Sequence, residues 1–224
     1  MTFSIVARCA KTGQFGMAVA SSSPAVAARC AYARAGVGAA ASQNVTDPRL
    51  GPAALDQLAA GLDAGAALDA VIGAAEHVEY RQLLIVDRDG NTAIHSGGKS
   101  LGIHTEHAAR DVAAAGNLLA NDTIPRAMVE AFLSSESHLG DRLITAMRGA
   151  LAVGGEAGPV HSAGMLLVDR QDWPLAELRC DWSEDCPIKN IAAAWDVYRP
   201  QMDEYVTRAL DPSAAPSYGV PGNE

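Results

Sequence analysis

Apolar and polar positions alternate at the start of the chain. Over residues 3–9 apolar side chains recur at every second position, as in a strand whose successive side chains point to opposite faces. A second apolar run covers residues 15–21, and the glycine-containing stretch 11–13 joins the two. This pattern predicts a β-hairpin with Thr2 at the tip of a buried strand.

Six later segments have the composition of strands. The residues of the turn 88–90, Arg-Asp-Gly, predict a second hairpin between two of these segments. The segments are residues 36–43, 80–87, 91–96, 112–119, 162–169 and 175–181.

Helical periodicity occupies the intervals between these groups of strands. Asp63 is expected to cap a helix, Asp122 or Thr123 another, and Asp185 a third. The alanine-rich stretch 24–34 is expected to form a loop or a short helix, and a polar loop is expected over residues 97–110. The helical patterns begin near residues 51, 64, 124, 140, 187 and 202.

Strands in runs, separated by helix pairs, favour an α+β fold over a parallel βαβ fold. Several segments are apolar on both faces, which predicts two stacked sheets with helices covering the outside. We expect a single domain over residues 1–210. Residues 211–224 are rich in Pro, Ser and Gly and are expected to form a flexible tail.

Charge and composition narrow the classes of partner. The formal net charge of −9 argues against a nucleic-acid partner. No stretch reaches the roughly 18–20 apolar residues of a membrane span, and the first apolar run lacks the preceding charges of a signal peptide. We therefore expect a cytoplasmic protein. The four cysteines and six histidines show no metal-ligand spacing, so we expect no metal and no cofactor.

Thr2 is the leading candidate for chemistry. If Met1 is removed, Thr2 carries both a hydroxyl nucleophile and a free α-amine, a known pair for activating a hydroxyl. The pKa of such an amine starts at about 7.7–8.0, close to working pH. With Met1 retained, Thr2 is an ordinary strand hydroxyl, and this alternative stays open.

Six stretches occur in order over residues 2–198: TFSIVARCAKTGQFGMAVASSSPAV, ARAGVGAAASQ, YRQLLIVDRDGNTAIHSG, AAAGNLLA, HSAGMLLV and LRCDWSEDCPI. Together they resemble the bacterial family known as domain of unknown function 1028. The resemblance implies the fold of N-terminal nucleophile hydrolases, with four layers in the order helix–sheet–sheet–helix. Members of that wider superfamily typically cleave amide bonds with an N-terminal Thr, Ser or Cys.

The resemblance also indicates site residues. Thr2, Gln43, the pair Arg81-Gln82 and Gly116-Asn117 match the leading threonine and recurring polar positions of the family. Before the stretch HSAGMLLV the family more often shows an acidic residue, an arginine-rich turn and a glutamine. Here Glu156 is available, the arginines are missing and His161 replaces the glutamine, which implies a changed specificity.

The polar candidates have distinct expected roles. The side-chain amide of Asn117 or Gln43 is expected to donate to an oxyanion. Arg81, with Gln82 beside it, pairs either with Asp47 or Glu79 or with a ligand carboxylate.

Two further candidates carry simpler alternatives. Ser22, within the run 21–23, offers a hydroxyl to a substrate or merely ends a strand. His161 is a candidate base or binding residue, although it cannot pair with Ser162, because adjacent strand residues point oppositely.

Two functions follow from these observations. The first is hydrolysis of a small amide or ureide-like C–N bond by Thr2, with a small-molecule substrate. The second is a non-catalytic, self-associating binding protein that keeps the fold. In either case we expect a homo-oligomer.

Overall fold

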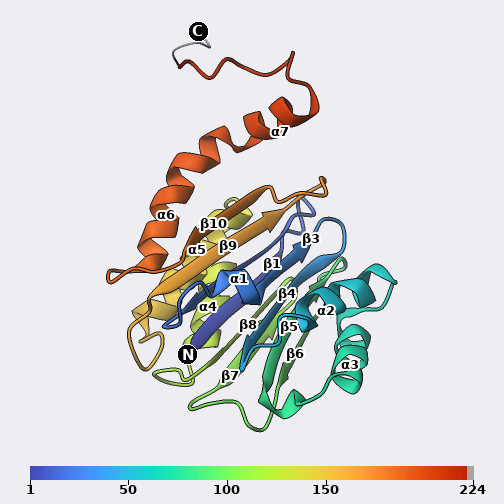
Figure 1. The fold of residues 1–224 in the computed structure, drawn as a ribbon, viewed down its shortest axis with the longest axis vertical. Coiled ribbons are helices and arrows are strands. Elements are labelled where there is room, and N and C mark those ends of the chain that lie inside the picture. Colours follow the sequence, from blue (N-terminus) through green and yellow to red (C-terminus); the bar gives the residue numbers. More distant parts are fainter. Residues whose placement is uncertain (221–224) are drawn as a thin grey trace.

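The computed structural model describes residues 1–220, so residues 221–224 of the predicted flexible tail lie outside the described part. Two antiparallel sheets form the centre of the molecule (Figure 1). One sheet has six strands and the other has four. In the six-stranded sheet the hairpin strands β1 (Thr2–Arg8) and β2 (Phe15–Ser21) pair from Phe3 opposite Ala20 to Arg8 opposite Phe15. The predicted N-terminal hairpin is therefore confirmed, with β1 at the middle of the larger sheet.

The strands and helices have the following bounds. The strands are β1 (Thr2–Arg8), β2 (Phe15–Ser21), β3 (Ala31–Arg34), β4 (Gly38–Asn44), β5 (Arg81–Asp87), β6 (Thr92–Ser96), β7 (Thr105–Ala109), β8 (Val112–Asn117), β9 (Ser162–Val168) and β10 (Ala176–Cys180). The six-stranded sheet has the order β10-β9-β2-β1-β8-β7, and the four-stranded sheet has the order β3-β4-β5-β6. The helices are α1 (Ala27–Cys30), α2 (Leu50–Ala59), α3 (Ala64–Ala74), α4 (Ile124–Leu133), α5 (Leu139–Ala152), α6 (Pro187–Tyr198) and α7 (Met202–Leu210), with 3-10 turns at Val78–Tyr80 and Arg199–Gln201.

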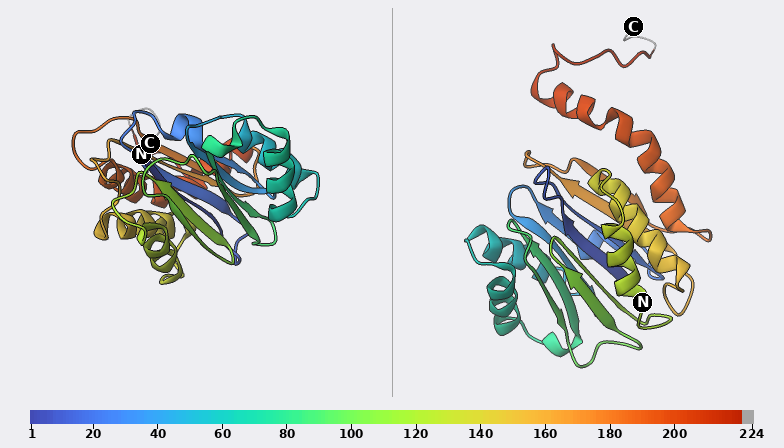
Figure 2. Two further views of the ribbon diagram at one scale, coloured as in Figure 1. Left: turned by 90° about the horizontal axis from the view of Figure 1, so that it is seen from below. Right: turned by 180° about the vertical axis from the view of Figure 1, so that it is seen from behind.

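Three apolar clusters separate four layers. The first lies between the six-stranded sheet and helices α4, α5 and α6, the second between the two sheets, and the third between the four-stranded sheet and helices α2 and α3. Figure 2 shows the two helix layers on opposite sides of the strands. On β1, Phe3 and Ile5 face the helices, whereas Val6 faces the other sheet. The expectation of sheets with two dry faces is therefore confirmed.

Some predicted elements differ from the observed ones. The alanine-rich stretch 24–34 contains the short helix α1 and also strand β3, and the expected polar loop 97–110 contains strand β7. Strand β7 lies at the edge of its sheet and alternates between exposed and half-buried residues, so it lacks the apolar signal of a central strand. The described chain accordingly has ten strands, more than the eight segments predicted.

The predicted helix caps have mixed outcomes. Asp63 caps α3, because its carboxylate accepts a hydrogen bond from the Ala66 N–H at 2.8 Å. The cap positions of α4 and α6 are Thr123 and Cys186, and neither makes a side-chain cap bond. The prediction for Asp185 was wrong by one residue, since the N–H of Asp185 itself donates to the Ser183 hydroxyl. Helix α7 extends beyond the sheets (Figure 1).

The sandwich has two chemically different ends. At one end, which we call the Thr2 end, β1 begins and Asn117 of β8 donates to Gln82 of β5 at 3.3 Å. At the other, the Asp87 end, the N–H of Asp111 donates to the carbonyl of Gly90 at 2.8 Å. None of the helices in the described part combines the length and apolarity that crossing a bilayer requires.

Candidate functional site

Thr2 lies at the start of β1, where the two neighbouring strands of the larger sheet flank it. It is 6% exposed and stands opposite Asn117 of β8. On the other side, its hydroxyl lies 3.3 Å from the hydroxyl of Ser21 on β2. Cross-strand neighbours share a face of the sheet. Thr2, Ser21 and Asn117 therefore form one buried polar row at the end of three adjacent strands.

Met1 occupies the space in front of this row. Its carbonyl oxygen accepts a hydrogen bond from Thr2 Oγ1 at 2.5 Å and a second one from the Ser21 hydroxyl. A Cβ atom added at Gly158 would lie 2.9 Å from Met1 Cε, so the Met1 side chain lies against this glycine. The site is thus filled by the residue whose removal the threonine mechanism requires.

Glu156 closes the same end of the sheet. It is 4% exposed, and its Oε2 accepts a hydrogen bond from the Ser22 N–H at 3.0 Å. Its Oε1 is buried and has no hydrogen-bond partner. Burial raises the pKa of this carboxyl to about 7, against the opposing effects of the amino-terminal charge and the bond from Ser22. A neutral or half-charged carboxyl therefore stands beside the amino terminus at neutral pH.

A chain of three amides links this site to the second sheet. Gln43 Nε2 donates to Gln82 Oε1 at 2.7 Å and to the Ala115 carbonyl at 3.2 Å. Asn117 Nδ2 donates to the same Gln82 oxygen at 3.3 Å. Both N–H groups of the Gln43 amide are therefore engaged, and Gln43 has none left for an oxyanion. The side-chain amide of Asn117 uses only one of its two N–H groups, so Asn117 is the predicted oxyanion donor that remains available.

Arg81 lies at the same end but forms neither ion pair expected from the sequence. Its guanidinium donates to the Val45 carbonyl, and its Nε is buried without a partner. Asp47 instead pairs with Arg49 at 2.7 Å, and Glu79 pairs with Lys99 at 3.3 Å. The sequence did not anticipate these pairings because both partners lie outside the strand pattern.

Ser22 and His161 flank the site. Ser22 contributes its backbone N–H to Glu156, and the backbone N–H of His161 donates to the Ser21 carbonyl at 2.9 Å. The His161 ring stacks on Trp182 with centroids 4.3 Å apart, and its Nδ1 lies 2.9 Å from the Ser183 carbonyl. The His161 ring is therefore engaged at the rim, whereas its backbone helps to fix the Ser21 row.

From the sequence, Glu156 was recognised only as an available acidic residue, and its position beside Thr2 was not predicted. One signal was present, because Glu156 is the only Asp, Glu, Lys or Arg between residues 149 and 168. Within residues 1–220 no group of three or more His, Cys, Asp and Glu side chains could hold a metal ion. A surface hollow of about 300 Å³ lies elsewhere, between residues 169–175 and α7.

Comparisons with known proteins identify relatives of the whole domain. The crystal structure of protein SPO2555 from Silicibacter pomeroyi, described as DUF1028, is 29% identical, with a TM-score of 0.82 and 88% of each chain covered. Anbu, the ancestral beta-subunit from Yersinia bercovieri, is 11% identical with a TM-score of 0.40, over 90% of this chain and 96% of that one. The curated proteins give no match. The model of a family of unknown function, DUF1028, matches residues 2–191, and the chain therefore belongs to the DUF1028 family, as the resemblance indicated.

Proposed function

We propose that this protein hydrolyses a small amide or ureide-like C–N bond, with Thr2 as an N-terminal nucleophile after removal of Met1. The observation that carries the proposal is the buried row of Thr2, Ser21 and Asn117 beside Glu156, at the point where the freed α-amine would stand. The four-layer arrangement agrees with the fold that the family resemblance implies for N-terminal nucleophile hydrolases.

The chemistry proceeds through an ester on Thr2. The α-amine takes the proton of Oγ1, which attacks the substrate carbonyl carbon, and the free N–H of Asn117 stabilises the oxyanion. The C–N bond breaks as the ammonium returns its proton to the leaving nitrogen. Water, activated by the same amine, then releases the acid and regenerates Thr2. Arg81 is left out of this scheme, because its side chain lies on the face of β5 opposite to that of Gln82, which contacts Asn117.

Mass spectrometry and one pair of variants test this proposal. Intact mass of protein from its native host is expected to show loss of one methionine. On a panel of small amides and carbamoyl compounds, Thr2→Ala is expected to lower kcat/KM by at least about 1000-fold, while Thr2→Ser keeps measurable turnover. An active protein that fully retains Met1, or a Thr2→Ala variant with undiminished activity, would refute the threonine mechanism.

The second candidate, a non-catalytic self-associating protein, is favoured by a different observation. Helices α6 and α7 carry exposed apolar side chains, among them Val197 at 67% and Leu210 at 58% exposure, and α7 extends beyond the sheets (Figure 1). Such side chains suit a subunit interface. Light scattering on Val197→Asp is expected to show a smaller assembly than the parent protein, and an unchanged mass would remove this support.

A further inference from the structure

We propose that Glu156 is the positioning residue for the Thr2 α-amine: its unpaired Oε1 accepts a hydrogen bond from that amine once Met1 has been removed. The inference rests on the proposed maturation at Thr2, and it assigns a role to a residue that carried none in the sequence analysis.

Backbone bonds on one side fix where the carboxylate stands. The N–H of Ala120 donates to the Gly155 carbonyl and the N–H of Ala157 donates to the Leu118 carbonyl, both at 3.0 Å, and Leu119 forms a β-bridge with Glu156. These residues directly follow β8, the strand that pairs with Thr2. Glu156 is therefore attached to the extension of one neighbour of β1.

A side-chain bond fixes the carboxylate on the other side. Ser22, whose N–H donates to Oε2, directly follows β2, the other neighbour of β1. The carboxylate thus spans the gap between the ends of β2 and β8, beyond the start of β1. This is the space into which the first residue of the chain projects.

The carboxylate is one hydrogen bond short on this inward side. A buried carboxylate normally has partners on both oxygens, because leaving one unsatisfied costs about 1–3 kcal/mol or more. Oε2 of Glu156 accepts the Ser22 N–H, and Oε1 has no partner. This oxygen is therefore available to a donor that removal of Met1 brings to it.

The surroundings leave the amino terminus as the charged donor. Ser21, at the end of β2, uses its hydroxyl on the Met1 carbonyl, and Ser22, which follows it, donates its N–H to Oε2. Leu119, which follows β8, is a buried apolar residue. The ring of His161 is engaged with Trp182 and Ser183. In the Met1-bearing chain the positive charge that acts on the Glu156 carboxyl is that of the Met1 ammonium, which opposes the rise in pKa caused by burial.

Removal of Met1 supplies both the space and the donor. The carbonyl that now accepts from Thr2 and Ser21 leaves, and the side chain that lies against Gly158 leaves with it. The nitrogen of Thr2 changes from a peptide N–H into an amine with up to three protons. Oε1 can then orient the amine and stabilise the ammonium that forms when it takes the Oγ1 proton, as a carboxylate orients the base of a catalytic triad.

The test measures the α-amine directly and needs no substrate. Chains beginning at Thr2 are released from an N-terminal fusion, and their start is verified by intact mass. Competitive acetylation of the α-amine is followed across pH 5–10 by mass spectrometry of the N-terminal peptide. Because a carboxylate partner favours the charged amine, Glu156→Gln is expected to lower the amine pKa and to speed labelling at neutral pH about 5- to 10-fold.

Two further variants make the outcome decisive. Glu177→Gln makes the same change on an exposed residue of β10 and is expected to label like the parent. Glu156→Asp keeps the charge one methylene further back, so its profile is expected to fall between those of parent and Gln variant; it also serves if the Gln variant does not fold. Superimposable profiles for the parent and the Glu156 variants would overturn the assignment. Absence of amide hydrolysis alongside a shifted profile would instead refute only the proposed reaction.

Discussion

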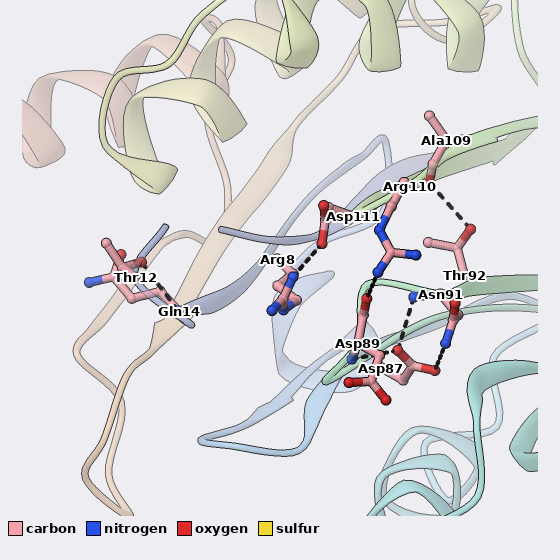
Figure 3. Close-up of polar contacts among 10 residues, drawn as sticks. All are labelled: Arg8, Thr12, Gln14, Asp87, Asp89, Asn91, Thr92, Ala109, Arg110 and Asp111. Atoms are coloured by element: carbon pink, nitrogen blue, oxygen red, sulfur yellow. Dashed lines mark hydrogen bonds and ion pairs between the residues drawn. The ribbon is translucent and has the colours of Figure 1, made fainter. Parts of the chain in front are cut away.

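The two ends of the sandwich each bury a carboxylate, with opposite results. Asp87 is 3% exposed and Glu156 is 4% exposed, so burial disfavours the charged form of both carboxyls. Asp87 accepts four hydrogen bonds at 2.9–3.0 Å, from the N–H groups of Ala64, Asp89 and Asn91 and from the Asn91 side chain. Figure 3 shows Asp87 with Asp89 and Asn91. These bonds outweigh burial and hold the Asp87 pKa below its ordinary value, whereas the Glu156 pKa rises to about 7.

The difference between the two pKa shifts follows from the number of hydrogen-bond donors that face each carboxylate. The Asp87 carboxylate ties the β5–β6 turn to the start of α3, and beside it Arg8 pairs with Asp111 at 2.8 Å (Figure 3). That end is a structural clamp in which both oxygens of the Asp87 carboxylate are used. Of the seven buried side-chain atoms without a partner in the described part, five lie toward the Thr2 end: Ser4 Oγ, Gln43 Oε1, Arg81 Nε, Ser100 Oγ and Glu156 Oε1. The other two are His138 Nε2 and Arg208 Nε. Unsatisfied buried groups are costly, and their concentration at one end is typical of a site rather than of a support.

The largest effect is expected from breaking the satisfied carboxylate. Asp87→Ala leaves four donors without their acceptor, one of them at the first turn of α3, and is expected to lower the free energy of unfolding by about 3–5 kcal/mol. Urea unfolding at neutral pH measures the loss. Asp87→Asn retains one acceptor oxygen and should lose less. A loss below about 1 kcal/mol would contradict the clamp.

A change of opposite sign in the free energy of unfolding is expected when the Glu156 carboxylate is removed. In the Met1-bearing protein the folded carboxyl has a pKa of about 7 against an ordinary 4.5, so the folded state keeps the proton longer than the unfolded state and stability falls as pH rises between these values. Glu156→Gln removes this penalty. We expect it to raise the free energy of unfolding by up to about 3 kcal/mol at pH 8, and by little at pH 4.5.

Unfolding curves at both pH values check this expectation, with the exposed Glu177→Gln as control. Chains that begin at Thr2 give a second test. In them an α-ammonium paired with Glu156 would reduce the cost of burying the charged carboxylate, so Glu156→Gln would raise the free energy of unfolding by less. A gain that is the same at both pH values would show that the Glu156 charge is not its cause.

The smallest effect is expected from the ion pair at the Asp87 end. Arg8 and Asp111 are both 21% exposed, so solvent screens their attraction, and Arg8→Met is expected to cost about 1 kcal/mol. The loss should shrink at high salt. A cost as large as that of Asp87→Ala would show that the clamp depends on charge pairing and not on the number of backbone donors.

The sequence anticipated features that depend on neighbours along the chain. The N-terminal hairpin and the Asp63 cap were both visible in short stretches. Strand β7 was missed because an edge strand has no apolar period. Of the two alternatives for Arg81, the ion pair with Asp47 or Glu79 does not form, because those carboxylates have other partners. Thr2 and Asn117 were singled out, but nothing in the sequence indicated that they pair directly on the neighbouring strands β1 and β8.

By itself, the sequence predicted the layers, because strands that are apolar on both faces need cover on both sides, and strands grouped in runs disfavour a parallel βαβ fold. The tertiary structure alone decided which polar atoms are satisfied. Ser22 and Glu156 are 134 residues apart, and Gln43 and Ala115 are 72 apart, so no local pattern encodes their bonds. Hydrophobic burial follows a periodicity that each segment carries, whereas hydrogen-bond satisfaction is fixed only when distant segments meet.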